Sequence, residues 1–363
     1  MNKQKYTSSG SVGGRINGQK AFPVRESNIE LLRILAMLLV VLFHIDLLGM
    51  SLDTASADRW QDVSLVGYAW LKSLSMPCVN LFVFISGWFG IQFDRRKFLS
   101  LCFTVAFFSV SIYFYFVLTA SDVTFSPKYF LYTVFGLGYW FVPSYLLLYL
   151  FSPVLNRFAD VSDRKTFGTT LVGLYLFMFV YGWLFDNHWF DKGCSPLFFF
   201  YLYLTARYFH RHPVPLTRLG WQVYAAVFVA VSVVVALLAL LLFRSGADLW
   251  AWRLFHYNSP FNLLETLSLF FCFTRLHFSS RFINRLASVS FAIYLFHAHP
   301  LFFEKVFHPF FYGLFLRASG LPFAGYAVGF VGLMVVGSMA FHLCRVAVWK
   351  GWDGCCRFIR GKK

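Results

Sequence analysis

Three ionisable side chains lie inside apolar stretches of the sequence, at positions where a membrane helix normally carries hydrocarbon side chains. Arg33 and His44 belong to LLRILAMLLVVLFHIDLL (residues 31–48), and Glu265 belongs to YNSPFNLLETLSLF (residues 257–270). Ionisable groups are costly inside a bilayer, so they usually face the interior of a helix bundle and serve a site. An imidazole can take a proton from a hydroxyl group, and a carboxylate can hold that imidazole in one tautomer. These residue types predict acid–base chemistry within the membrane.

The spacing of Arg33 and His44 places them on one face of a helix. They are eleven residues apart, which is three turns plus about 20°, and about 16 Å along the axis. Glu30 precedes Arg33 by one turn, a spacing suited to an ion pair. We expect Arg33 near the cytoplasmic surface and His44 in the outer half. Two simpler alternatives stay open: Arg33 only snorkels to the headgroups, and His44 only bonds a neighbouring helix.

Glu265 is expected at about the depth of His44, since its helix would enter from the outer side only a few residues earlier. At that depth its carboxylate would orient the His44 imidazole and stabilise the protonated form. The alternative is a Glu265 that is protonated or bonded locally to Thr266 or Ser268.

Other polar and aromatic side chains accompany these residues. Tyr294 and His297 are spaced one turn apart in SVSFAIYLFHAHPLFF (288–303), and we expect His297 to support the site by hydrogen bonding rather than to catalyse. Trp140 stands close to Pro143, where a kink would open a cavity, although plain aromatic packing is the alternative. Arg95 and Arg96, in DRRK, either set the orientation in the membrane or bind phosphates of a cytoplasmic cosubstrate.

The elements that must position these residues are membrane helices. The chain has 363 residues, 58% hydrophobic and 13% charged, with a mean hydropathy of +0.62; soluble domains carry about 25% charged residues. The net charge of +16 then reports topology rather than nucleic-acid binding. Taking about 20 residues per crossing, we expect ten spans, at about 29–49, 65–91, 98–119, 129–151, 166–185, 195–210, 221–243, 260–276, 286–303 and 323–349.

The distribution of positive charge supports this count. With a cytoplasmic N-terminus, 23 of the 32 Lys and Arg fall in cytoplasmic segments and 8 in outer ones, as the positive-inside rule requires for an even number of spans. The sequence thus predicts an all-α polytopic bundle with both termini cytoplasmic. We divide it into a flexible tail (1–28, without the apolar core of a signal peptide), a membrane domain (29–349) and a basic tail (350–363). The scattered cysteines predict no metal site.

Several motifs in order, from about residue 26 to the last helix, resemble the membrane acyltransferase family 3. They are the Arg and His of the first helix, then NLFVFISGWFGIQFDRRKF, YWFVPSYLLLYLFSPVLN, YNSPFNLLETLSLF and INRLASVSFAIYLFHAHP. The chain is most similar to the polysaccharide O-acyltransferases of Gram-negative anaerobes such as Bacteroides. The resemblance implies a multi-pass bundle of the bacterial inner membrane. Such a bundle moves an acyl group from cytoplasmic acyl-CoA to a hydroxyl of an outer surface polysaccharide or lipid-linked glycan.

The resemblance also implies roles for single residues. The essential histidine of the family matches His44 and its arginine matches Arg33, whereas the usual RxxR pair matches Arg95 and Arg96 only approximately. Acyl-CoA, a cosubstrate rather than a bound cofactor, would place its phosphates near these arginines and its thioester at His44. His44 would act as general base with Glu265 orienting it; an acyl-imidazole intermediate is the alternative. Substrate-binding or oxyanion-stabilising roles fall to a further set: Asn258, Ser259, Tyr294, His297 and Trp140.

Two other classes of function compete. An exporter or flippase of glycan precursors would also use intramembrane ionisable residues, but we find no duplicated halves or paired broken helices. A structural scaffold would leave Arg33, His44 and Glu265 without a purpose. Acetyl is the expected acyl group and succinyl is open, as are the acceptor sugar and the oligomeric state. Beyond these substrates, membrane lipids are the expected partners.

Overall fold

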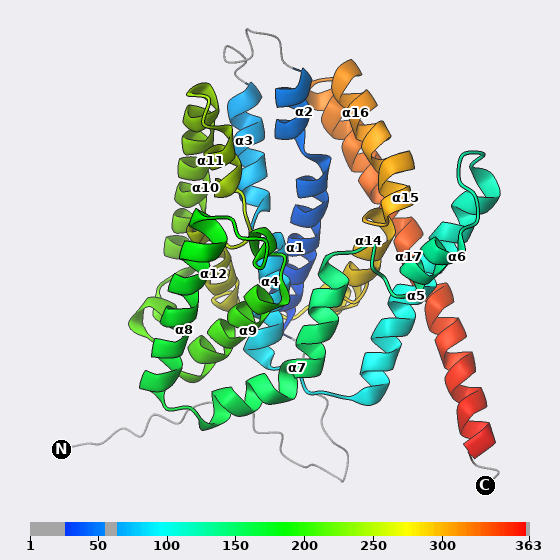
Figure 1. Ribbon diagram of the computed structural model, residues 1–363, viewed down its shortest axis with the longest axis horizontal. Coiled ribbons are helices and arrows are strands. Elements are labelled where there is room, and N and C mark those ends of the chain that lie inside the picture. The colour runs from blue at the N-terminus through cyan, green and yellow to red at the C-terminus, as the bar shows by residue number, and fades with distance from the viewer. Residues whose placement is uncertain (1–25, 55–63, 361–363) are drawn as a thin grey trace.

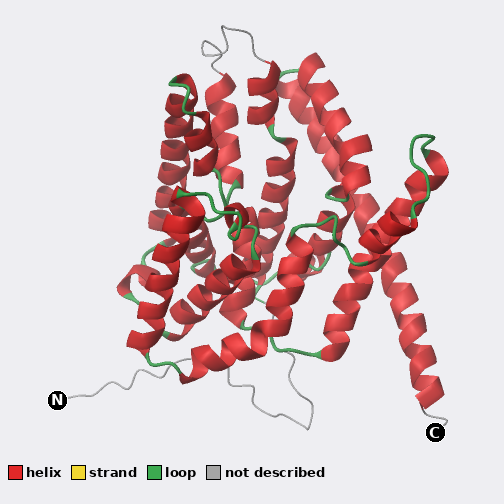
Figure 2. Ribbon diagram, viewed as in Figure 1, coloured by secondary structure: helices red, strands yellow, loops and turns green. Residues whose placement is uncertain are grey.

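The computed structural model describes residues 26–54 and 64–360, and within these ranges the chain consists of helices and connecting turns without a strand (Figure 2). The prediction of an all-α bundle is confirmed. Most of the predicted tail at 1–28 lies outside the described residues. The predicted basic tail at 350–363 begins inside the last helix, α17 (Gly320–Arg360), and only 361–363 lie outside the description.

The first half of the bundle is built from helices that continue across short breaks. Asp46 has left-handed backbone angles (φ 49°, ψ 51°) and ends the first helix, yet the next begins one residue later. Pro77 similarly separates the third and fourth helices. Because these breaks are short, Ser27–Leu52 and Ser64–Phe89 each form one apolar span. The helices are α1 (Ser27–Ile45), α2 (Leu47–Thr54), α3 (Ser64–Ser75), α4 (Cys78–Phe89) and α5 (Arg95–Thr119).

The middle of the chain starts its helices with capping side chains. Ser126, Asp163 and Ser195 each accept a hydrogen bond from a backbone N–H in the first turn of the following helix, which satisfies donors that a helix cannot pair internally. The helices of this part are α6 (Pro127–Val134), α7 (Phe141–Val161), α8 (Arg164–Met178), which continues as the π-helix η2 (Phe179–Leu184), and, after the 3₁₀ turn η3 (Asp191–Gly193), α9 (Pro196–Arg211). Of these, α7 begins without a side-chain cap.

The last part contains the longest helices and the sharpest bend. The stretch Arg281–His297 meets Pro300–Arg317 at 70°, because Pro300 cannot continue the preceding helix. After the 3₁₀ turn η4 (Pro215–Arg218), the elements are α10 (Trp221–Arg244), α11 (Asp248–Leu254), α12 (Pro260–Thr274), α13 (Arg281–Ala287), α14 (Ser290–His297), α15 (Pro300–Phe302), the π-helix η5 (Phe303–Phe307), α16 (His308–Arg317) and α17.

Helix α1 lies in the middle of the bundle (Figure 1). It packs against α3, α4 and α12 on one side and against α13 and α14 on the other.

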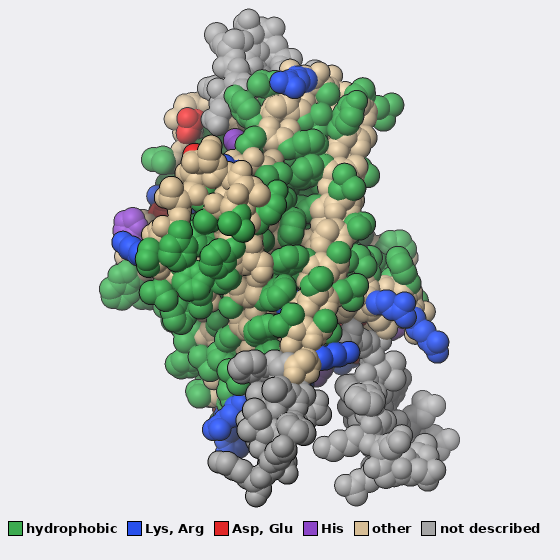
Figure 3. Space-filling model, turned by 90° about the vertical axis from the view of Figure 1, so that its right-hand side faces the viewer, with side chains coloured by type: hydrophobic (Ala, Val, Ile, Leu, Met, Phe, Trp, Pro, Cys, Tyr) green, Lys and Arg blue, Asp and Glu red, His purple; other side chains and the backbone are tan. Residues whose placement is uncertain are grey.

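Close approach of α4 and α9 depends on Gly87: a Cβ there would lie 2.5 Å from the Tyr203 carbonyl oxygen. A side chain at this position would therefore force the two helices apart. The face formed on the right of Figure 1 is mostly hydrophobic, with several Lys and Arg side chains at its lower end (Figure 3).

The chain has the helices of a multi-pass membrane protein, but the count of ten spans is not confirmed. Among the described residues, six helices are long and apolar enough to cross, or seven if the bent pair is one span. Expected spans 195–210 and 260–276 correspond to α9 and α12, of 16 and 15 residues, and 129–151 is divided between α6 and α7. The start of α1 and the end of α17 lie toward the same edge of Figure 1, while the assignment of that edge to the cytoplasm stays a prediction.

Candidate active site

His44 lies in the last turn of α1 and is hydrogen-bonded to a second histidine. Its Nδ1 is 3.0 Å from Nε2 of His297, in the last turn of α14. His297 is fully buried, and its Nδ1 is 2.7 Å from the backbone carbonyl oxygen of Ile293. The expected supporting role of His297 thus has a definite partner in the structure.

These two contacts define where the protons lie when both rings are neutral. A carbonyl oxygen can only accept, so Nδ1 of His297 must carry its proton, and Nε2 of His297 is then an acceptor. His44 must therefore donate from Nδ1 to Nε2 of His297, which leaves Nε2 of His44 without a proton. An imidazole in this tautomer can take a proton at Nε2 while its partner holds the ring in place.

His44 lines a cavity of about 270 Å³ on its side of the bundle, referred to here as the outer cavity. Its walls are largely aromatic, with Trp140, Tyr294 and Phe303 among the lining residues. Phe303 belongs to η5 and its ring packs against His44 at 5.8 Å between centroids. Trp140 therefore lines a cavity, which it shares with His44.

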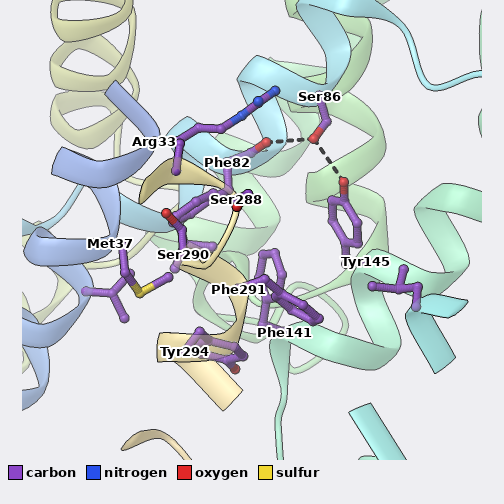
Figure 4. A pocket seen from close by; sticks show the side chains of 14 residues that line it. Arg33, Met37, Phe82, Ser86, Phe141, Tyr145, Ser288, Ser290, Phe291 and Tyr294 are labelled. Carbon is purple, nitrogen blue, oxygen red and sulfur yellow. Dashed lines mark hydrogen bonds between the residues drawn. The ribbon is translucent and has the colours of Figure 1, made fainter. Parts of the chain in front are cut away.

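A second cavity, of about 290 Å³, is lined by Arg33 and is referred to here as the inner cavity. In Figure 4 the Arg33 guanidinium extends toward Ser86, whose hydroxyl bonds both the Phe82 carbonyl oxygen at 2.8 Å and the Tyr145 hydroxyl at 3.1 Å. Arg33 also pairs with Glu30 at 2.7 Å, as its spacing predicted. A third of its side chain stays accessible (33%), so the guanidinium retains donors for an anion.

Tyr294 lines both cavities. It therefore forms part of the wall between the Arg33 compartment and the His44 compartment. The predicted alignment of Arg33 and His44 along one face of α1 corresponds in the structure to two adjoining spaces at two depths of the bundle. A long donor molecule held near Arg33 would have to pass Tyr294 to present a reactive group to His44.

Glu265 is placed differently from the expectation. It is buried and accepts a hydrogen bond from the Ser73 hydroxyl at 3.0 Å, across the contact of α12 with α3. The hydrogen-bonding partner of His44 is instead His297. The helix depth of Glu265 could be estimated from sequence, but its rotation toward α3 depends on packing. His297, and not Glu265, is therefore the residue in contact with the His44 imidazole.

Asn258 and Ser259 are buried away from both cavities. They line neither cavity. The Asn258 amide nitrogen instead lies beside Gly182 in η2, 2.9 Å from the position that a Cβ added to this glycine would take. Ser259 precedes α12 without a hydrogen bond from its hydroxyl to any described residue. Of the three expected oxyanion donors, Tyr294 alone reaches the lining of the outer cavity.

Arg95 and Arg96 lie exposed at the start of α5, outside the lining of the inner cavity. The turn before them, however, is fixed to the bundle. Asn156 donates to the Ile91 carbonyl oxygen at 2.9 Å, and the Ile91 N–H donates to Tyr203 at 2.8 Å. The structure brings Arg33, but not this pair, into the inner cavity.

Sequence reasoning missed a partly buried ion pair close to His44. Lys72, expected among the outer charges, is buried in α3 and bonds the Asp46 carboxylate at 2.9 Å. Its ammonium also lies 3.9 Å from the centre of the Phe43 ring. The signal was available in Asp46 itself, an acid two residues after a membrane histidine in an apolar stretch.

Sequence reasoning also missed Glu304, which lines the outer cavity from η5. From the sequence, Glu304 is expected in an outer loop. The π-helix that directs its side chain toward the cavity has no clear sequence signature. The neighbouring Lys305 pairs with Asp122 in the loop after α5. The hydrogen bond from Lys305 lowers the pKa of Asp122 from its usual value, so this pair is charged at neutral pH.

Comparison with known proteins gives one result. The family model described as an acyltransferase domain, that of acyltransferase family 3, matches residues 26–343. No curated protein and no solved structure gives a significant match. The matched range contains the two cavities, the histidine pair and Arg33.

Proposed function

The chain belongs to membrane acyltransferase family 3, and from this premise we propose that it transfers an acyl group, acetyl by default, from cytoplasmic acyl-CoA to a glycan hydroxyl outside the membrane. The acceptor is a surface polysaccharide or a lipid-linked precursor, and the membrane is the bacterial inner membrane. Succinyl-CoA is the alternative donor.

The observation that supports this proposal most directly is the chain of hydrogen bonds from Ile293 through His297 to His44. It presents Nε2 of His44 as an unprotonated base beside the outer cavity. His297 accepts from Nδ1 of His44 and so opposes rotation of the ring. An oriented base of this kind is what attack by a hydroxyl group on a thioester requires.

The reaction balances with these groups alone. The acceptor hydroxyl oxygen attacks the thioester carbonyl carbon while its proton passes to Nε2 of His44. The C–S bond then breaks, the ester remains on the sugar, and the CoA sulfur leaves and takes the proton from His44. The Tyr294 hydroxyl, at the wall between the cavities, is the proposed donor to the oxyanion of the intermediate. An acyl group carried briefly on His44 is the alternative route.

Arg33 is the proposed anion site for the donor. Its guanidinium lines the inner cavity, and guanidinium groups bind phosphate through charge-assisted, often paired hydrogen bonds. Arg95 and Arg96, at the start of α5, would meet the donor before it enters. The donor arm then extends past Tyr294 toward His44, over a distance on the order of the ~16 Å between Arg33 and His44.

Transfer from labelled acetyl-CoA to extracted surface glycan, with purified full-length protein in lipid nanodiscs, tests the proposal. We expect label on the glycan, and a loss of at least about 100-fold in His44→Ala, the lower range for a general base. His277→Ala is the matched control, since His277 is exposed in the turn after α12. Full activity of His44→Ala, or movement of unlabelled glycan across a vesicle membrane without acyl transfer, would contradict the proposal.

A further inference from the structure

We propose, on the premise of the function above, that the outer cavity receives the acceptor as a neutral or amino sugar and excludes sugars that carry a carboxylate or phosphate, with Glu304 enforcing the selection. The selection acts on the charge of the sugar unit that is acylated. It defines a substrate class for the reaction and gives a role to Glu304, which the reaction itself does not use.

Glu304 is the lining residue that gives this cavity its charge. Among the described residues (26–54 and 64–360), no Lys, Arg or Asp lines the cavity beside it. Its side chain is exposed, and no hydrogen bond or ion pair joins it to another residue in the described part of the chain. An unpaired carboxylate facing an open cavity is available to accept hydrogen bonds from a ligand.

Two neighbouring cations do not neutralise it, because each is already paired. Lys305, the next residue, is bonded to Asp122. Lys72, close to His44, is bonded to Asp46 at 2.9 Å. The outer cavity therefore presents a net negative charge, whereas the inner cavity presents the positive charge of Arg33.

The aromatic walls of the outer cavity suit the apolar face of a sugar ring. Trp140, Tyr294 and Phe303 supply aromatic rings, which pack against the C–H face of a pyranose, and the carboxylate can accept bonds from its hydroxyls. The cavity volume of about 270 Å³ matches one sugar unit rather than an oligosaccharide. An acidic sugar in this space would bring a second negative charge within a few ångströms of Glu304.

The expected discrimination follows from the repulsion of like charges. At separations of about 5–8 Å and an effective dielectric constant of about 20, it amounts to about 30- to 300-fold. Comparison of two sugars that differ only in one group at C6 measures this discrimination directly. Methyl galactoside carries a hydroxymethyl group there, and methyl galacturonate carries a carboxylate.

The first experiment identifies the acylated residue in the native glycan. Mass spectrometry compares surface glycan from the native host, a deletion strain and the complemented strain. We expect the lost acyl group to come from a neutral or amino sugar. Loss from a uronic acid or a phosphate-bearing sugar overturns the inference while leaving the acyltransferase proposal intact. If no acyl group is lost, the acyltransferase proposal fails first.

The second experiment assigns the selection to Glu304. Nanodisc protein with labelled acetyl-CoA is offered methyl galactoside and methyl galacturonate in competition, and the ratio of products is measured. We expect at least about 10-fold preference for the galactoside, falling to within about 3-fold in Glu304→Gln, which keeps the shape and removes the charge. Asp248→Asn, an exposed acid at the start of α11, should leave the ratio unchanged. An equal or reversed preference in the unmodified protein, or an unchanged ratio in Glu304→Gln, contradicts the role of Glu304.

Discussion

At the scale of single residues, the proposed mechanism gives the two histidines distinct functions that substitution can separate. His297 contacts His44 and a carbonyl oxygen, and it does not line the outer cavity. Its proposed role is therefore to position the base.

We predict that His297→Ala lowers kcat about 10- to 100-fold with little change in KM for acetyl-CoA, since it removes the acceptor that fixes the His44 tautomer. His297→Gln should retain more activity, because its amide nitrogen can donate to the Ile293 carbonyl oxygen and its amide oxygen can accept from His44. Steady-state kinetics of both variants check this. Equal loss in the two would contradict this prediction, because neither the bulk nor the hydrogen-bonding groups of glutamine would then replace the imidazole.

For Arg33 we expect a change in KM for acetyl-CoA rather than in kcat. We predict that Arg33→Ala raises KM for acetyl-CoA by about 10-fold or more, because one charge-assisted contact to phosphate contributes about 1.5–3 kcal/mol. Arg33→Lys should recover part of the affinity. Binding of CoA to detergent-solubilised protein, measured by calorimetry, separates affinity from turnover. An unchanged affinity in Arg33→Ala would support the snorkelling alternative instead.

The residues that sequence could place are those whose geometry follows from one helix. Arg33, Glu30 and His44 share α1, so their order, spacing and ion pair were predictable. Glu265 and Asn258 were not, because the direction of their side chains depends on how α12 and the turn before it pack against other elements. The His44 to His297 contact joins residues 253 apart in sequence, and no local pattern encodes it.

At the scale of elements, the end of α1 is fixed to α3 by the pair of Asp46 and Lys72. The burial of the two partners is unequal: 8% of the Lys72 side chain is exposed against 41% of the Asp46 side chain. The consequences of removing either partner should be unequal as well.

We predict that Asp46→Asn destabilises the protein more than Lys72→Met. The first leaves a buried ammonium without its counter-charge, at a cost of about 3–5 kcal/mol, and the second leaves a half-exposed carboxylate, at about 1–3 kcal/mol. The double variant should recover part of the loss. Thermal unfolding of the four proteins, followed by tryptophan fluorescence, tests the order. A larger effect of Lys72→Met would show that its contact with Phe43 outweighs the ion pair.

The contact of α4 with α9 depends on Gly87. We predict that Gly87→Ala costs about 1–3 kcal/mol, since the new methyl group would meet the backbone of Tyr203. Gly67→Ala in α3 is the matched control: nothing lies within 4 Å of its added Cβ, so it should be neutral or slightly stabilising. If both variants melt at the same temperature, close packing at Gly87 is not a source of stability.

The elements themselves were predictable to different degrees. Long apolar helices such as α5, α10 and α17 coincide with the expected spans. The bend of 70° before Pro300 and the π-helix η5 were not expected, because hydropathy records how apolar a segment is and not where it turns. The bend supplies Ala298 and Pro300 to the lining of the outer cavity, and η5 supplies Phe303 and Glu304, so the least predictable elements line the proposed acceptor site.

At the scale of the whole molecule, the distribution of charge predicts the orientation in the membrane. We expect the turn before α8 to face the cytoplasm and the turn after α10 to face outward. In a background with Cys344, Cys355 and Cys356 replaced by serine, an impermeant maleimide added to intact spheroplasts should label Ser245→Cys and not Arg164→Cys. Both positions are exposed. The reverse pattern would invert the topology and separate Arg33 from cytoplasmic acyl-CoA.

Family membership and the all-α membrane bundle were predictable from the sequence, and the family match confirms the first. The Bacteroides-type branch, the count of ten spans and the identity of donor and acceptor stay predictions. The count depends on how short helices such as α9 and α12 are supported by their neighbours rather than on their own length.

The two cavities adjoin at Tyr294 without forming a single space. The proposed function joins a cytoplasmic donor to an external acceptor, and an open passage between them would let protons and ions leak down the membrane potential. The aromatic side chain of Tyr294 stands between the two cavities, and only a long, thin donor arm would need to pass it. The proposed transfer would then leave the membrane electrically sealed.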